Sequence, residues 1–76
     1  MTKIHTIQIT PPFIKLEQFL KFVSLVSSGG EAKLLIQNSE VTVNGKICRE
    51  RGRKLFGGEK ISLIQAPEEI FMVTMK

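Results

Sequence analysis

The residues with the clearest chemical potential are basic and lie in one short segment. Five of the eleven Lys and Arg residues fall within Lys46–Lys54, where Glu50 is the single acidic residue. This basic segment therefore carries the whole net charge of +4, while six basic and six acidic residues balance elsewhere. A charge-balanced chain with its positive surplus in one place is typical of a protein that binds a polyanion.

Three arginines alternate within the basic segment: Arg49, Arg51 and Arg53. If the segment is extended, their side chains leave one face about 6.5–7 Å apart, because a strand rises ~3.3 Å per residue. That spacing is close to the phosphate repeat of a nucleic-acid strand, and a guanidinium group can hold a phosphate at two points or stack on a base. Gly52 would keep the main chain open to close approach. The three arginines and Lys54 form a candidate phosphate-binding row. The alternative is that the segment is a solvated loop that only aids solubility.

A second candidate site lies at the start of an expected helix, at Ser28, Gly29 and Gly30. The first turn of a helix leaves N–H groups unpaired and partly positive, and two glycines would let a phosphate reach them. Lys33 would add a full charge one turn later, and Lys15, which opens an earlier helix, could join the same surface. The alternative is that the glycines only make a turn and the lysines are ordinary exposed residues.

The inventory of side chains argues against other classes of function. The chain has no Asp, no Tyr, one His (His5) and one Cys (Cys48), so neither a catalytic set nor a four-ligand zinc site can be assembled. We therefore expect no enzymatic activity, no cofactor and no small-molecule substrate. No apolar run approaches the ~20 residues of a membrane span, and a single cysteine fits a reducing cytoplasm.

The elements that must position these residues begin with a strand over residues 3–9, which two prolines end. A helix is expected over residues 15–26, because Leu16, Phe19, Leu20 and Val23 follow helical spacing. A second helix should start with Ser28 as N-cap and Glu31 in a capping box, and should end at Asn38-Ser39. Its apolar face comprises Ala32, Leu35 and Ile36, widened by Leu34. Two short helices with a tight connection form an αα-hairpin.

The second half of the chain has the pattern of β structure. Val41 and Val43 alternate into Asn44-Gly45, a strong hairpin signal. A turn at residues 57–58, a strand with Ile61 and Leu63, a turn at residues 66–69 and a strand over residues 70–75 should follow. The expected fold is a single α+β domain over residues 1–76, with the αα-hairpin packed on a small, mainly antiparallel sheet.

Four ordered blocks within residues 13–64 resemble the RNA-binding domain named after ribosomal small-subunit protein four, the S4 domain. The blocks are KLEQFL at residues 15–20, SGGEAKLLI at 28–36, VTVNGK at 41–46 and GEKI at 58–61. They are similar to the RLDxxL, SxxxAxxLI, VxVNG and GDxI patterns of that family. The resemblance implies a motif core at residues 13–64, flanked by the strands at 3–9 and 70–75.

The resemblance also implies a function, which is non-enzymatic binding of structured RNA, often ribosomal, through the αα-hairpin and nearby loops. Many family members have Arg after the helix-opening Ser, where this chain has Gly29. The variant SGGxAK, followed by RGRKL at residues 51–55, is similar to the short stand-alone YaaA-type members of bacteria. That branch implies a role in assembly of the large ribosomal subunit.

The leading hypothesis is a monomeric protein that binds structured RNA, with ribosomal RNA as the expected partner. With few aromatic residues for stacking, we expect weak readout of single-stranded bases. The candidate RNA-binding residues are Lys15, Ser28, Gly29, Gly30, Lys33, Arg49, Arg51, Arg53 and Lys54. The alternatives are an adaptor that docks an acidic partner protein and, ranked third, DNA binding near replication or repair machinery.

Overall fold

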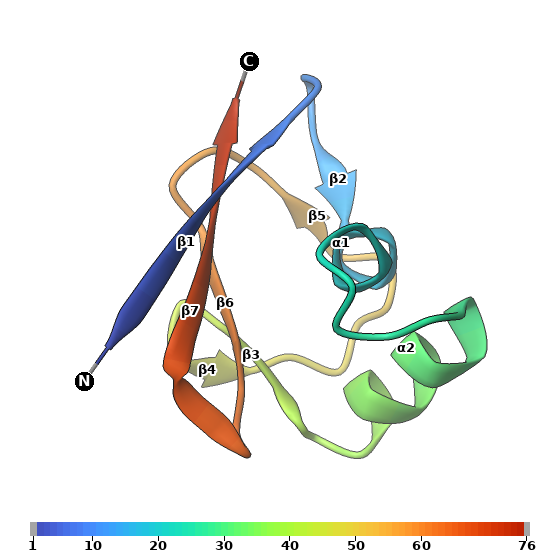
Figure 1. Ribbon diagram of the computed structural model, residues 1–76. Coiled ribbons are helices and arrows are strands. Elements are labelled where there is room, and N and C mark those ends of the chain that lie inside the picture. The colour runs from blue at the N-terminus through green and yellow to red at the C-terminus, as the bar shows by residue number, and fades with distance from the viewer. Residues whose placement is uncertain (1, 76) are drawn as a thin grey trace.

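The structure is a computed structural model that describes residues 2–75. Within these residues the chain forms two helices and seven strands (Figure 1), in the order β1 (Lys3–Ile9), β2 (Ile14–Lys15), α1 (Leu16–Phe22), α2 (Gly29–Gln37), β3 (Val41–Val43), β4 (Lys46–Ile47), β5 (Lys54–Leu55), β6 (Lys60–Leu63) and β7 (Ala66–Met75). No helix in this part of the chain is long and apolar enough to cross a membrane. The expected α+β class is confirmed.

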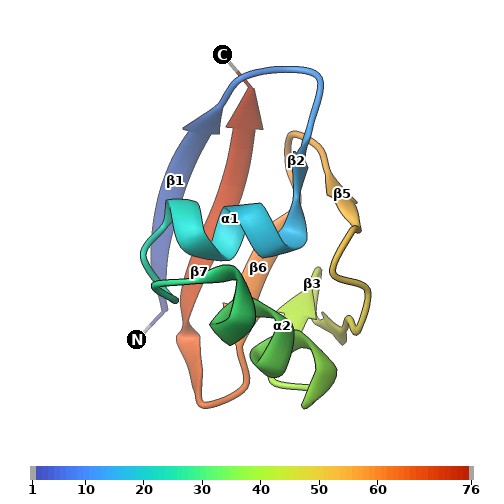
Figure 2. The ribbon, with the colours of Figure 1, turned by 90° about the vertical axis from the view of Figure 1, so that its right-hand side faces the viewer.

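The strands form a five-stranded sheet in the order β1-β7-β6-β3-β4 and a separate two-stranded pair, which we call the β2–β5 ribbon. The sheet is mainly antiparallel, as expected, but β1 and β7 run parallel, with His5 opposite Phe71. Figure 2 shows both helices in front of the sheet and the β2–β5 ribbon beside them. One face of the sheet is therefore covered by helices.

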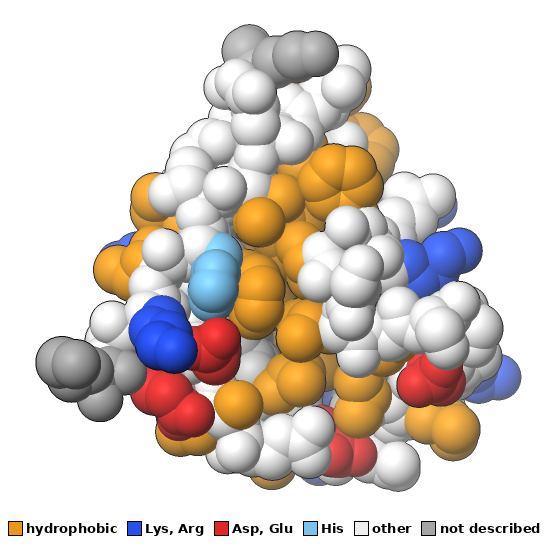
Figure 3. Space-filling model, viewed as in Figure 1, with side chains coloured by type: hydrophobic (Ala, Val, Ile, Leu, Met, Phe, Trp, Pro, Cys, Tyr) orange, Lys and Arg blue, Asp and Glu red, His pale blue; other side chains and the backbone are white. Residues whose placement is uncertain are grey.

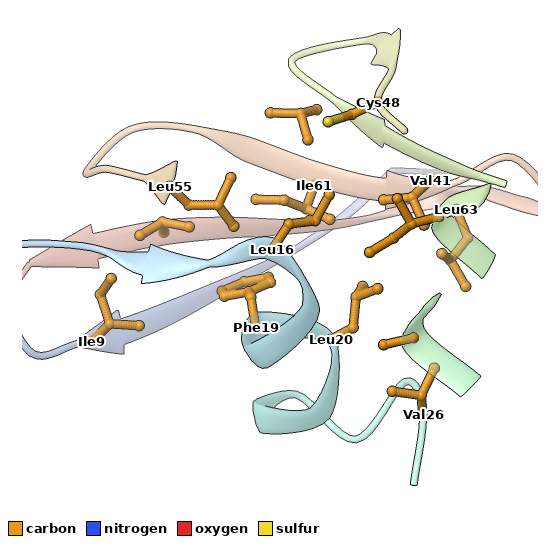
Figure 4. Packing of buried hydrophobic residues seen from close by; sticks show 14 residues of the cluster. Ile9, Leu16, Phe19, Leu20, Val26, Val41, Cys48, Leu55, Ile61 and Leu63 are labelled. Atoms are coloured by element: carbon orange, nitrogen blue, oxygen red, sulfur yellow. The ribbon is translucent and has the colours of Figure 1, made fainter. Parts of the chain in front are cut away.

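The core lies between the helices and the sheet. The helical stripe expected in α1 is confirmed for Leu16, Phe19 and Leu20, which are fully buried, whereas Val23 lies just past the helix and is only partly buried. Figure 4 shows these side chains pointing from α1 toward the strands, where Leu55 and Ile61 are also fully buried. The helical period of α1 and the two-residue period of the strands thus supply the two sides of the core.

The second helix contributes Ala32 and Ile36 to the core, and Leu35 packs partly against it. Leu34 does not widen this face as expected, because its side chain is 59% exposed. A helix turns by about 100° per residue, so Leu34 points away from both Ala32 and Ile36, two positions on either side of it.

The first helix ends earlier than expected, at Phe22 rather than residue 26. Ser24 leaves the helix with φ +62°, and the N–H of Leu25 donates to the carbonyl oxygen of Leu20 at 3.0 Å. This turn carries Val26 back into the core, where it is 6% exposed. The helix thus lacks its expected last turn, and the bend that takes its place buries the Val26 side chain.

The start of α2 follows the expected cap with one difference. Ser28 is the N-cap, and its Oγ accepts a hydrogen bond from the N–H of Glu31 at 3.2 Å. The Glu31 carboxylate, however, bonds to the N–H and hydroxyl of Ser27 instead of returning to the N-cap residue. The cap itself is confirmed, and the reciprocal half of the capping box is displaced by one residue.

The turn at Asn44-Gly45 is confirmed, with positive φ at both residues (55° and 84°), as a two-residue type I′ hairpin requires. The turn expected at residues 66–69 is wrong, because the chain turns at residues 64–65 and β7 begins at Ala66. Pairing with two neighbouring strands outweighs the local turn signal. Pro67 is accommodated where the β6–β7 register shifts, the kind of irregularity at which strands tolerate proline.

Candidate nucleic-acid interface

The basic segment is not extended. After β4 the chain forms no strand until Lys54, and Arg51 and Gly52 make a turn in which the N–H of Arg53 donates to the carbonyl oxygen of Glu50 at 3.2 Å. The three arginines therefore do not form the straight row that an extended segment would give. The segment has to turn because it leads from the edge strand β4 to the β2–β5 ribbon beside α1.

The backbone of the basic segment holds the start of α1. The N–H of Leu16 donates to the carbonyl oxygen of Arg53 at 2.8 Å, and the N–H of Glu17 donates to that of Arg51 at 3.2 Å. These N–H groups belong to the first turn of a helix, where no intrahelical acceptor is available. The segment is thereby fixed next to Lys15, the N-cap of α1.

Exposed basic side chains lie both at this junction and at the end of α2. Lys15 on β2 lies directly opposite Lys54 on β5 in the ribbon, and both are exposed. Arg51 is exposed in the turn, and the Nε of Arg49 donates to the Oγ of Ser39 at 2.7 Å, just past the end of α2. From Arg49 onward, the basic segment therefore runs from the end of α2 to the start of α1.

Arg53 differs from the other arginines because its charge is used inside the protein. Its Nη2 lies 2.6 Å from Glu59 Oε1, with the two side chains 39% and 17% exposed. Glu59 also accepts from the N–H of Phe56 at 2.7 Å and from Asn44 Nδ2 at 3.3 Å, while Asn44 Oδ1 accepts from the N–H of Lys60 at 3.0 Å. Glu59 thus ties the basic segment to the β3–β4 turn.

The surroundings of Glu59 favour its charged form. Burial raises the pKa of the carboxyl group, but hydrogen bonds from Phe56, Arg53 and Asn44, together with the charge of Arg53, lower it further, so the net pKa lies below its usual value of 4.5. Glu59 in turn raises the pKa of the Arg53 guanidinium. The Nε of Arg53 is buried without a partner among the described residues.

The sequence reasoning missed this cluster because Asn44 and Glu59 are 15 residues apart and no local spacing joins them. The available signal was that they lie in two of the blocks that resemble one family. In the structure, Asn44 forms part of the hairpin turn, and Glu59 supplies the carboxylate that holds this turn.

The other candidate site, at the start of α2, is open. Ser28, Gly29 and Gly30 are exposed, and among the described residues a Cβ added at Gly29 would meet no atom within 4 Å. Glu31 is also there, and hydrogen bonds from the Ser27 hydroxyl and backbone lower its pKa, so its negative charge opposes a bound phosphate.

The two candidate sites lie at opposite ends of α2. Ser28 is the N-cap and Asn38 the C-cap of the helix, which separates its two ends by about 15 Å at 1.5 Å per residue. Lys33 is exposed between them. In Figure 3, Lys and Arg side chains are visible on the right-hand side, where Figure 1 has the helices, and also on the left, and a hydrophobic strip separates the helices from β1 and β7.

Comparison with known proteins adds two findings. The family model described as the S4 domain matches residues 7–72. The chain is also similar to the "Probable ribosome maturation protein RlbA" of Bacillus subtilis (strain 168), with 40% identity over 59 residues, which is 78% of this chain and 83% of that protein.

Proposed function

The chain belongs to the S4 domain family, and from this premise we propose that it is a non-enzymatic protein that binds structured RNA. The resemblance seen in its four sequence blocks is thereby confirmed. The observation that carries the proposal is the anchored basic segment, which places Lys15, Arg51 and Lys54 around the start of α1 with their side chains exposed. Such a fixed group of positive charges suits the regular phosphates of RNA.

The proposed RNA-binding surface extends from this junction along α2. Arg49 lies at the end of α2, Lys33 on the helix, and Ser28–Gly30 at its start. An RNA helix presents phosphates on both sides of a groove, so one structured RNA can reach both ends of α2. In this proposal the two helices act together as an αα-hairpin, and the Arg53 side chain stabilises the fold through its ion pair with Glu59.

We propose ribosomal RNA as the partner and ribosome assembly as the process, because the similar Bacillus subtilis protein is described as a ribosome maturation protein. The resemblance to the YaaA-type branch makes the large subunit the first candidate. We further propose that residues 1–76 act as one RNA-binding domain, as a monomer, in the cytoplasm where ribosomes are assembled.

A salt-titrated binding assay with fragments of ribosomal RNA, with duplex DNA as competitor, tests the proposal. If four or five phosphates are engaged, the logarithm of the association constant should fall with the logarithm of salt concentration at a slope of about −3 to −4. We expect RNA to compete better than DNA, since the helices lack a pattern rich in Arg, Asn and Gln that reads base edges.

Two results would contradict RNA binding. Equal competition by duplex DNA would favour the DNA alternative. Absence of binding at low salt, together with protein partners that remain captured after nuclease treatment, would favour an adaptor that docks an acidic protein.

A further inference from the structure

The outer face of the β2–β5 ribbon has a composition that phosphate binding alone does not explain. Ile14 pairs with Leu55, which is fully buried, so this pair faces the core. Side chains alternate between the two faces of a strand, so the neighbouring positions Phe13, Lys15, Lys54 and Phe56 lie on the other face. They form a group of two aromatic rings beside two ammonium groups.

The contacts within this group show how closely it is packed. The ring centroids of Phe13 and Phe56 lie 6.1 Å apart with the rings tilted by 55°, and Lys54 Nζ lies 5.0 Å from the centroid of Phe13. The latter distance is within the range of a cation–π contact. Phe56 nevertheless remains 49% exposed.

Two features of this face are unfavourable for the protein alone. Lys15 and Lys54 lie directly opposite each other, and like charges in directly opposed positions destabilise a strand pair. Phe56 also leaves half of a large apolar side chain in water. A nucleotide relieves both, because its phosphate neutralises the lysines and its base covers an aromatic ring.

We propose that the outer face of the β2–β5 ribbon binds an unpaired nucleotide of the RNA, with the base stacked on Phe56 and the phosphate between Lys15 and Lys54. This inference rests on the proposed RNA-binding function and specifies the kind of RNA. The target is then a structured RNA that presents an unpaired base beside a helix. We expected weak readout of unpaired bases because the chain has few aromatic residues. This inference places such readout at Phe56 alone.

The backbone around Phe56 is held in place before any ligand binds. Its N–H donates to Glu59 Oε2 at 2.7 Å, and its carbonyl oxygen accepts from the N–H of Glu59 at 3.3 Å. The N–H of Gly58 donates to the carbonyl oxygen of Val73 at 2.8 Å, which fastens the turn to β7. A preformed ring loses little conformational freedom on binding, which favours its use as a stacking surface.

The test uses two RNA hairpins with the same number of phosphates. One carries a single bulged adenosine, and the other has an abasic residue at that position. We expect the protein to bind the hairpin with the base at least about fivefold more tightly, the low end of what stacking on an aromatic ring contributes. Phe56→Leu should remove this preference and leave affinity for the abasic hairpin unchanged. Circular dichroism melting checks that the variant is folded.

Phe22→Leu is the matched control, because Phe22 is also exposed (60%) but lies on α1, where it lines a hollow with Phe13 and Ile14 that does not include Phe56. It should retain the preference for the base. Equal affinity of the unmodified protein for both hairpins overturns the inference while supporting RNA binding. A preference that persists in Phe56→Leu, or is lost equally in Phe22→Leu, overturns the assignment to Phe56. Binding to neither hairpin contradicts the proposed function itself.

Discussion

At the scale of single residues, neighbouring arginines have different roles. Arg51 has an exposed side chain, and among residues 2–75 only its backbone carbonyl makes a hydrogen bond, which holds α1. Arg53 directs its guanidinium group to Glu59, whose carboxylate also holds Asn44 and Phe56. The positive charge of Arg51 is therefore available for binding, whereas that of Arg53 stabilises the fold.

This difference predicts that substitution of Arg51 affects RNA binding, whereas substitution of Arg53 affects the free energy of unfolding. Arg51→Ala should weaken RNA binding and reduce the magnitude of the salt slope by about one, without changing stability, because one phosphate contact is lost. Arg53→Ala should lower the free energy of unfolding by about 1 kcal/mol, a value kept small because its side chain is 39% exposed. Salt-titrated binding and urea denaturation measure the two effects. A binding loss confined to Arg53→Ala would reverse the assignment.

Glu59 predicts a dependence of stability on pH. The net pKa of this carboxyl group is lowered in the folded state, so the charged form stabilises the fold above about pH 4.5 and that contribution is lost as pH falls through the folded-state pKa. Glu59→Gln should reduce stability by about 1–2 kcal/mol at pH 7, and the difference from the unmodified protein should shrink below pH 4.5. Urea denaturation between pH 7 and pH 3 checks this. A difference that stays constant across that range would show that the charge of Glu59 is not involved.

At the scale of elements, the junction between the basic segment and α1 depends on backbone hydrogen bonds. The carbonyl oxygens of Arg51 and Arg53 satisfy the first N–H groups of α1, so side-chain changes at these positions leave the junction formed. The turn at Arg51-Gly52 points these two carbonyl groups toward the first turn of α1. The conformation of the turns, more than their side chains, therefore determines where the basic residues lie.

Gly52 and Gly58 both lie in turns, so substitutions there test the contribution of turn conformation. A Cβ added at Gly52 would meet open space among the described residues, so Gly52→Ala should change the free energy of unfolding by less than about 0.5 kcal/mol. Gly58 has φ +92°, a conformation that strains any residue with a Cβ, so Gly58→Ala should cost about 1–2 kcal/mol. Thermal or urea unfolding compares them. With stability unchanged, any loss of RNA affinity in Gly52→Ala would report close approach of RNA to the main chain, and equal destabilisation by both changes would contradict the described turn.

At the scale of the whole molecule, the fold brings separate parts of the chain to one surface. The helices cover one face of the sheet (Figure 2), and the basic segment crosses from the end of α2 to the start of α1. Since the rest of the chain is charge-balanced, the field of the molecule is dominated by this region. An RNA should therefore approach in one preferred orientation, with the basic segment and the β2–β5 ribbon facing it.

The sequence alone determined the features that depend on short spacing. The helical stripe of Leu16, Phe19 and Leu20, the Ser28 cap and the Asn44-Gly45 turn each depend on a few adjacent residues, and all are confirmed. The position of the positive charge is likewise a property of the sequence. These signals are local because side-chain period, capping and turn conformation are set within a few residues.

Only the tertiary structure decided which residues meet. Lys15 lies opposite Lys54, and Asn44 meets Glu59, because strands and turns that are far apart in the chain are brought together by the packed core. Residues 66–69 are likewise drawn into β7 against their local turn signal, because Glu69 pairs with Lys3 on β1 and Ala66 pairs with Leu63 on β6. Local sequence does not encode such contacts, since their free energy depends on partners that only the complete fold supplies.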